Sequence, residues 1–182
     1  MSESYFDQHV PADEHGFSKY VIAKYIEQAE NITELRIFGI YGPGEDYAIR
    51  FVSNAICKSL FDLPVTLRQD RSFDYLWVED LVPVVAHFIG NDGAYSAYNV
   101  TPDESSSLRA IGERVIELSG KELDLQIAAA GKGAPYSGDN ARLRAEIAQL
   151  RFTPERDAVG RLYRWYAERV DSLDRSLLLV DR

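Results

Sequence analysis

Apolar side chains recur at two spacings along this chain, and the change from one spacing to the other predicts its elements. From residue 16 to about residue 30 they fall three or four positions apart, which is the spacing of an α-helix. Residues 35–40 form a short continuous apolar run that ends at Gly42, Pro43 and Gly44. Such a run before a Gly-Pro-Gly turn predicts a parallel strand whose carboxyl end faces a ligand crevice.

The same alternation continues to the end of the sequence. Further helices are expected at residues 47–61, 80–90, about 106–119, 140–150 and 155–182, and strands at 64–69, 73–80, 97–100 and 123–130. Asp80 is expected to cap one helix, Ser105 or Ser106 the next, and Gly120 to end the latter. Residues 1–14 are expected to form an extended surface segment. Strand–helix alternation throughout predicts an α/β fold.

Composition adds mainly exclusions. The 182 residues suffice for a single domain, with 46% hydrophobic residues and a net charge of −9. Because no basic run is interleaved with aromatic residues, a nucleic-acid partner is not expected. No apolar stretch approaches the ~18–20 residues of a membrane span, and the amino terminus is polar. No membrane partner is therefore expected, and the cytoplasm is the expected location.

The single cysteine, Cys57, excludes an internal disulfide framework and a cysteine-based metal cluster. It lies in an apolar helical pattern, which favours a core residue over a reactive thiol. The three histidines, His9, His15 and His87, have no ligand spacing. No metal site is expected.

The stretch HGFSKYVIAK, residues 15–24, carries the chemistry worth testing. Tyr20 and Lys24 are four residues apart, so they lie on one face of the predicted helix. An ammonium beside a phenol lowers the pKa of the phenol and makes it a proton donor for carbonyl chemistry. The stretch also contains Lys19 directly after Gly16-x-Ser18.

Six landmarks follow in one order: GFSK at a helix start, LRIFGIYGPGE, FDLPVT, FDYLWVEDL, YNV and a late RLYRWY. This order resembles the carboxy-terminal half of NAD-dependent epimerases/dehydratases, the extended short-chain dehydrogenase/reductase family that acts on nucleotide sugars. The resemblance covers essentially the whole chain. It implies a partial Rossmann-like fold that lacks the amino-terminal dinucleotide-binding half and keeps the small carboxy-terminal substrate-binding subdomain.

The resemblance also implies how the chain is organised and what its parent protein does. Residues 1–182 would form a single domain, with residues 15–62 a remnant of the Rossmann core and residues 63–182 mixed core and substrate-binding subdomain. The parent chemistry would be hydride transfer at a sugar carbon with NAD or NADP, serving surface-polysaccharide precursors.

Three departures from the family pattern matter, and the first concerns the cofactor. The family builds its dinucleotide site on a Gly-rich turn after its first strand, and no such turn occurs here. We therefore expect no cofactor to be bound by this chain alone. The chain is expected to be half of a protein: an expressed fragment, a truncated reading frame, or a subunit that needs its other half.

The second departure concerns catalysis. Aligned on Gly16, Ser18 and Lys19, the position of the family's catalytic tyrosine holds His15. Lys19 matches the lysine that contacts the nicotinamide ribose, so His15 and Lys19 are the catalytic candidates and Lys19 the cofactor-binding one. His15 is either an acid or base, or an exposed residue without a catalytic role. The Tyr20–Lys24 pair is five residues out of register and points elsewhere.

The third departure concerns substrate contacts. The family's asparagine after L-R-x-x is Gly39 here, and the arginine of its R-D-F motif is Phe73. A phenyl ring does not replace an arginine that clamps a diphosphate. Arg71 shares a strand face with Phe73 and is a candidate substitute. The expected substrate-binding residues are Gly39, Tyr41, Arg50, Arg71 and Phe73. Lys58, Arg68, Arg142 and Arg144 are further candidates, and each of these charges is otherwise a solvated surface residue.

Two functions follow. The chain is either the substrate-side part of an NAD(P)-dependent nucleotide-sugar enzyme, not catalytically self-sufficient, or a non-catalytic assembly module derived from that family. Its partners would be a nucleotide sugar, and either a complementing amino-terminal half or a second copy. The helix at residues 16–29 is a usual dimer surface in the family, and an open sheet edge invites pairing.

Overall fold

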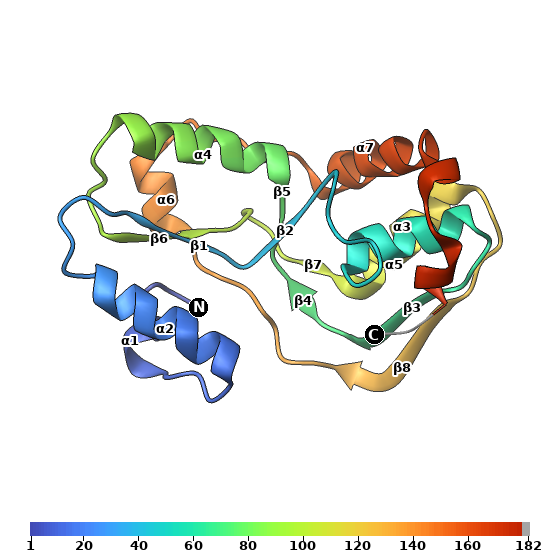
Figure 1. Cartoon of the computed structure of the whole chain (residues 1–182), viewed down its shortest axis with the longest axis horizontal. Coiled ribbons are helices and arrows are strands. Elements are labelled where there is room, and N and C mark those ends of the chain that lie inside the picture. Colours follow the sequence, from blue (N-terminus) through green and yellow to red (C-terminus); the bar gives the residue numbers. More distant parts are fainter. Residues whose placement is uncertain (180–182) are drawn as a thin grey trace.

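Parallel strand pairs flanked by helices form the framework of the chain (Figure 1). The computed structural model describes residues 1–179. The helices are α1 (Tyr5–Gln8), α2 (Glu14–Ile26), α3 (Phe51–Leu60), α4 (Val78–Gly90), α5 (Leu108–Ser119), α6 (Ala141–Glu146) and α7 (Glu155–Ala167), followed by the 3-10 turns η1 (Val170–Ser172) and η2 (Arg175–Leu178). The strands are β1 (Glu34–Ile37), β2 (Gly39–Tyr41), β3 (Val65–Asp70), β4 (Ser72–Phe73), β5 (Tyr75–Trp77), β6 (Ala97–Val100), β7 (Ser106–Ser107) and β8 (Leu125–Lys132). This alternation confirms the α/β prediction.

The apolar run at residues 35–40 is divided between two strand partners. Its first part, β1, pairs in parallel with β6, and its second part, β2, pairs in parallel with β5. The strands β3 and β8 form another parallel pair, and β4 pairs antiparallel with β7. The chain therefore crosses at Phe38 from one sheet to the next and links the two ends of the molecule (Figure 1).

Two separate clusters of buried apolar side chains lie at these two ends. One joins α4, β5, β6 and α6 through Leu76, Val84, Tyr98, Val100, Leu143, Ile147 and Leu150. The other joins α3, α5, α7 and β3, and its fully buried members include Val52, Ile56, Cys57, Val65, Ile111, Val115 and Leu162. Each end of the molecule is thus held by its own core.

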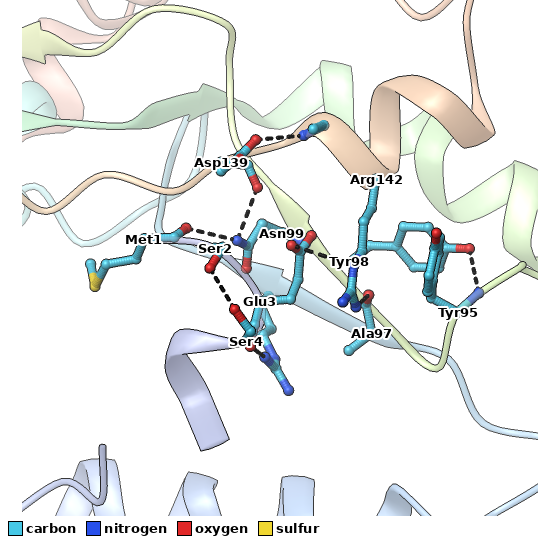
Figure 2. Close-up of polar contacts among 12 residues, drawn as sticks. Met1, Ser2, Glu3, Ser4, Tyr95, Ala97, Tyr98, Asn99, Asp139 and Arg142 are labelled. Atoms are coloured by element: carbon cyan, nitrogen blue, oxygen red, sulfur yellow. Dashed lines mark hydrogen bonds and ion pairs between the residues drawn. The ribbon is translucent and has the colours of Figure 1, made fainter. Parts of the chain in front are cut away.

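The amino-terminal segment is not extended throughout, as was expected, and it is partly buried. Its residues 1–3 dock beside β6, where the Met1 carbonyl accepts hydrogen bonds from Asn99 Nδ2 (3.1 Å) and Asp139 N (2.8 Å) (Figure 2). Glu3 is buried, and its Oε1 accepts a hydrogen bond from Asn99 N at 3.0 Å. The segment then forms α1, whose Phe6 ring packs on Tyr20 at 4.8 Å. Polar contacts with β6, which the local sequence does not reveal, fix this segment.

Two of the expected helix caps lie elsewhere. The helix α4 begins earlier, at Val78, and the Asp80 carboxylate instead accepts two hydrogen bonds from Thr153, from its N and its Oγ1, both at 2.7 Å. Neither Ser105 nor Ser106 caps α5; Ser107 does, by accepting a hydrogen bond from Ala110 N. The expected end of α5 is confirmed, because Gly120 lies there with a φ of 64°. Asp80 was wrongly predicted because it accepts its hydrogen bonds from Thr153, which is distant in the sequence. The cap of α5 lies one residue later than Ser106.

Candidate ligand-binding cleft

A cleft of about 550 Å³ opens between the start of α3 and the strands β3 and β8. Its volume lies in the range of small-molecule sites. It is lined by Ala48, Ile49, Phe51, Asn54, Thr66, Leu67, Arg68, Gln69, Arg71, Phe73, Tyr75, Leu108, Gln126, Ile127 and Ala128. The wall is therefore largely apolar, with a few polar groups that can orient a ligand.

The charge of this lining is opposite to the charge of the chain. Among residues 1–179, Arg68 and Arg71 line the cleft and no aspartate or glutamate does, although the chain has a net charge of −9. Within residues 1–179, neither arginine forms an ion pair with a carboxylate. A guanidinium that forms no ion pair offers several N–H donors to a phosphate or carboxylate. The cleft is suited to an anionic ligand.

Tyr75 supplies a neutral phenol to the same cleft. Burial and the charge of Glu45 raise the pKa of Tyr75 to about 12, against the opposing influence of Arg50 and Arg71. The phenol therefore stays protonated near neutral pH. It can donate a hydrogen bond to a ligand oxygen, and it is not a proton acceptor under those conditions.

Gly39 and Phe73, both expected at the substrate site, meet in the structure. A Cβ atom on Gly39 would lie 2.4 Å from Phe73 Cε1 and 3.0 Å from the Asp74 carbonyl oxygen. Real Cβ atoms essentially never approach other atoms that closely, so residue 39 has no room for a side chain. Phe73 lines the cleft and stacks on Tyr75, with ring centroids 4.4 Å apart.

Tyr41 and Arg50 lie outside the cleft lining. Tyr41 is 2% exposed, and its ring meets the edge of Trp77 with centroids 5.6 Å apart. Burial raises the pKa of Tyr41 far above the usual range. Arg50 is exposed and directly precedes α3. The structure therefore places Arg71 and Phe73 in the cleft lining, Gly39 against Phe73, and Tyr41 in the core.

The candidate catalytic residues lie apart from the cleft. His15 and Lys19 are exposed on α2, which lies at the opposite end of the molecule from β3 and β8 (Figure 1). The second pair on this helix has a structural role. Lys24 Nζ bonds to Asp7 (2.5 Å) and Glu27 (2.8 Å), which raises the pKa of Lys24, and Tyr20 packs on α1.

Several lining residues were not identified from the sequence. Gln126 and Ala128 come from β8, and Asn54 and Phe51 come from α3. The alternating pattern LDLQIAAA indicated an exposed strand, but its pairing with β3, in which Gln126 lies opposite Thr66, is not visible in the sequence. Strand register was the missing information.

Among residues 1–179, no group of three or more His, Cys, Asp or Glu side chains is placed to hold a metal ion. In the same part of the chain, no helix has the length and apolar character needed to cross a bilayer.

No model of a known protein family matches this sequence. Solved structures do match its fold. A dTDP-glucose 4,6-dehydratase from Bacillus anthracis in complex with NAD is 15% identical, with a TM-score of 0.76 over 92% of this chain and 56% of that chain. A UDP-glucose 4-epimerase from Thermotoga maritima with UDP-glucose is 17% identical, with a TM-score of 0.71 over 88% and 55%. A UDP-glucuronic acid 4-epimerase from Bacillus cereus in complex with UDP-glucuronic acid and NAD is 18% identical, with a TM-score of 0.70 over 88% and 54%.

These likenesses establish the fold. The chain spans about half the length of the structures it matches. Over that part it has the mixed α/β arrangement, with parallel strands, of these Rossmann-like enzymes. The sequence resemblance to NAD-dependent epimerases and dehydratases is thereby confirmed for the fold.

Proposed function

We propose that this chain is the substrate-side part of an NAD(P)-dependent nucleotide-sugar epimerase, dehydratase or reductase, and that its cleft binds the nucleotide sugar. The observation that carries this proposal is a pair of arginines in a cleft to which no aspartate or glutamate among residues 1–179 contributes, in an otherwise acidic chain. A nucleotide sugar combines a charged diphosphate with two rings. Arginine binds phosphate oxygens in pairs, and the apolar wall shields the rings from water.

The chain's own residues do not fit a dinucleotide. The turn Gly42-Pro43-Gly44 lies between β2 and α3, but the Glu45 carboxylate already occupies the start of α3, where it accepts a hydrogen bond from Ser53 Oγ. A pyrophosphate would meet this negative charge. Lys19 would contact the cofactor, and His15 would handle a proton, only once a cofactor-binding part is supplied.

A complementing dinucleotide-binding part is the partner that this function requires. Strand β1 has one described neighbour, β6, so its other edge is available to a further strand. Beside it, α2 exposes Phe17, Val21, Ile22 and Tyr25.

The runner-up function, an assembly module, is favoured by the same exposed face, which a second copy of the chain would cover. Supply of polysaccharide precursors and a cytoplasmic location are further parts of this proposal.

Calorimetric titration of the chain tests the first function. UDP-glucose is expected to bind with a micromolar to millimolar Kd, and NAD⁺ or NADH is not expected to bind measurably. Absence of binding by both UDP-glucose and UDP would refute the substrate-side proposal. Micromolar binding of NAD⁺ would refute the argument that the cofactor site lies outside this chain.

Light scattering tests the runner-up. An assembly module is expected to form a dimer at tens of micromolar, with α2 in the interface. A monomer at that concentration would eliminate this alternative and leave the complementing part as the partner.

A further inference from the structure

Residues 39 and 73, which both depart from the family pattern, lie against each other. The resemblance places an asparagine and an arginine at these positions, whereas this chain has Gly39 and Phe73. Because the Phe73 ring occupies the space that a Gly39 side chain would need, the glycine makes room for the phenyl group. Residue 73 is thus an apolar part of the cleft lining.

Neighbouring aromatic rings hold Phe73 in place. Its ring stacks on Tyr75 and also packs against Tyr136, with centroids 5.1 Å apart. Backbone hydrogen bonds fix Tyr136 beside β4, from Tyr136 N to Ser72 O (2.9 Å) and from Asp74 N to Tyr136 O (3.2 Å). The buried Asp74 carboxylate also accepts a hydrogen bond from Gly138 N at 2.7 Å. This end of the cleft is therefore a fixed aromatic surface.

Arg71 lies two residues from Phe73 and also lines the cleft. Alternate residues of an extended chain share a face and are about 7 Å apart. Arg71 is half-buried, and within residues 1–179 no carboxylate pairs with it. A partly desolvated guanidinium without a counter-ion gains most from an anionic ligand.

The place of Phe73 in the fold indicates which end of the cleft would hold the sugar and which would hold the nucleotide. Strand β4 lies between the β3–β8 pair and β1, and Tyr136 continues the contact from Phe73 to Phe38, at the end of β1 (centroids 5.1 Å). Strand β4, which carries Phe73, therefore lies nearer to α2 than β3 and β8 do (Figure 1). A sugar that reacts on the cofactor side must lie at the Phe73 end, and the nucleotide must lie toward β3 and β8.

We infer that Arg71 binds the phosphate next to the sugar and that Phe73 forms the surface on which the sugar ring rests, so that the cleft selects neutral nucleotide sugars over those with a sugar carboxylate. This inference rests on the proposed function and names its substrate class. Phe73 and Gly39 offer no cation or N–H donor from a side chain, so a carboxylate placed there would lose its hydration without compensation.

The role of Arg71 is tested by titrating UDP-glucose and UDP into Arg71→Gln. Loss of a charge-assisted hydrogen bond should weaken both ligands about ten- to a hundredfold. Arg161→Gln, on the exposed side of α7, is the matched control and should change each Kd by less than about twofold. If the wild-type chain binds UDP-glucose and Arg71→Gln binds it equally well, Arg71 is not the phosphate ligand, although the proposed function stands.

The role of Phe73 is tested with three ligands: UDP, UDP-glucose and UDP-glucuronic acid. The wild-type chain should bind UDP-glucose more tightly than UDP-glucuronic acid, about tenfold. Phe73→Leu should weaken UDP-glucose about two- to tenfold and leave UDP unchanged, because only the sugar loses its ring contact. Thermal unfolding followed by circular dichroism checks that the variant is folded. Equal loss for UDP and UDP-glucose, or a preference for UDP-glucuronic acid, would overturn the inference.

Discussion

The two ends of the molecule differ in how completely their helices are covered. At the cleft end, which comprises α3, α5, α7, β3 and β8, the apolar faces meet in one cluster, and Ile56, Ile111 and Leu162 are each 0% exposed. At the other end, α2 buries only Ala23, while its Tyr25 is 85% exposed. Both ends have regular helices, so they differ in packing and not in local folding.

Helix α4 shows the same difference within one element. One face is buried through Val84, which is 0% exposed. The opposite face exposes Val78, Val82, Val85 and Ile89, which recur at spacings of four, three and four residues. A helix that is apolar on both faces is expected to be covered on both. These exposed apolar faces of α2 and α4 support the proposal that this end of the molecule packs against another surface.

The largest expected effect is a difference between the two ends in how much a truncated side chain lowers the free energy of unfolding. Leu162→Ala at the cleft end should reduce the free energy of unfolding by about 2–5 kcal/mol, because it leaves a cavity in a filled core. Val21→Ala on α2 should change it by less than about 0.5 kcal/mol, since this side chain is 49% exposed. Urea denaturation measures both. Equal costs would mean that α2 is covered in solution.

The next largest effect is expected at Gly39 and Phe73, which lie against each other beside the cleft. Gly39→Ala should destabilise the chain by about 1–3 kcal/mol, because its Cβ would overlap the Phe73 ring. In a Phe73→Ala background the same change should cost less, since the ring is gone, although the nearby Asp74 carbonyl remains. The difference measures the coupling, expected at about 0.5–3 kcal/mol. Additive costs would show that the two replacements are independent.

These comparisons also show what the sequence could and could not predict. Strand β6 was predicted with its observed limits, because its apolar residues form a short run between turn signals, and Gly120 was predicted to end α5 because a left-handed residue favours glycine. The docking of Glu3 on Asn99 and the bonds of Asp80 to Thr153 were not, because both join distant segments. Of the residues that line the cleft, Arg71 and Phe73 were expected at the substrate site from the resemblance to the family's R-D-F motif, whereas the position of Gln126 depended on strand register.

A smaller effect concerns pH at the α4–α6 contact. The Glu146 carboxylate accepts hydrogen bonds from Ala94 N (3.0 Å) and Tyr98 OH (2.7 Å), with His87 Nε2 at 3.3 Å, and these hold the pKa of Glu146 below its usual value. An acid whose pKa is lower in the folded state stabilises the fold above its unfolded pKa. This stability is lost as the pH falls through the folded value.

Glu146→Gln should therefore destabilise the chain at pH 7 and flatten the fall in stability below about pH 4.5. Urea midpoints measured between pH 3 and pH 7 check this expectation. The exposed Glu122→Gln is the control and should leave the slope unchanged. Parallel pH profiles for wild type and Glu146→Gln would contradict the assignment.

The smallest effect on stability is expected from a comparison of how fast a thiol at each end reacts with a labelling reagent. Cys57 is 0% exposed in the cleft-end core, and burial, followed by the charge of Glu45, raises the pKa of its thiol to about 12. A thiol reagent at pH 8 needs an accessible thiolate, so the native wild-type chain should label only through unfolding. The thiol introduced by Val21→Cys should label within the mixing time, because that position on α2 is exposed.

Rapid labelling of Cys57 would show that the cleft end opens readily. Protection of the introduced thiol that increases with chain concentration would show that a second copy covers α2, which would favour assembly over a complementing half.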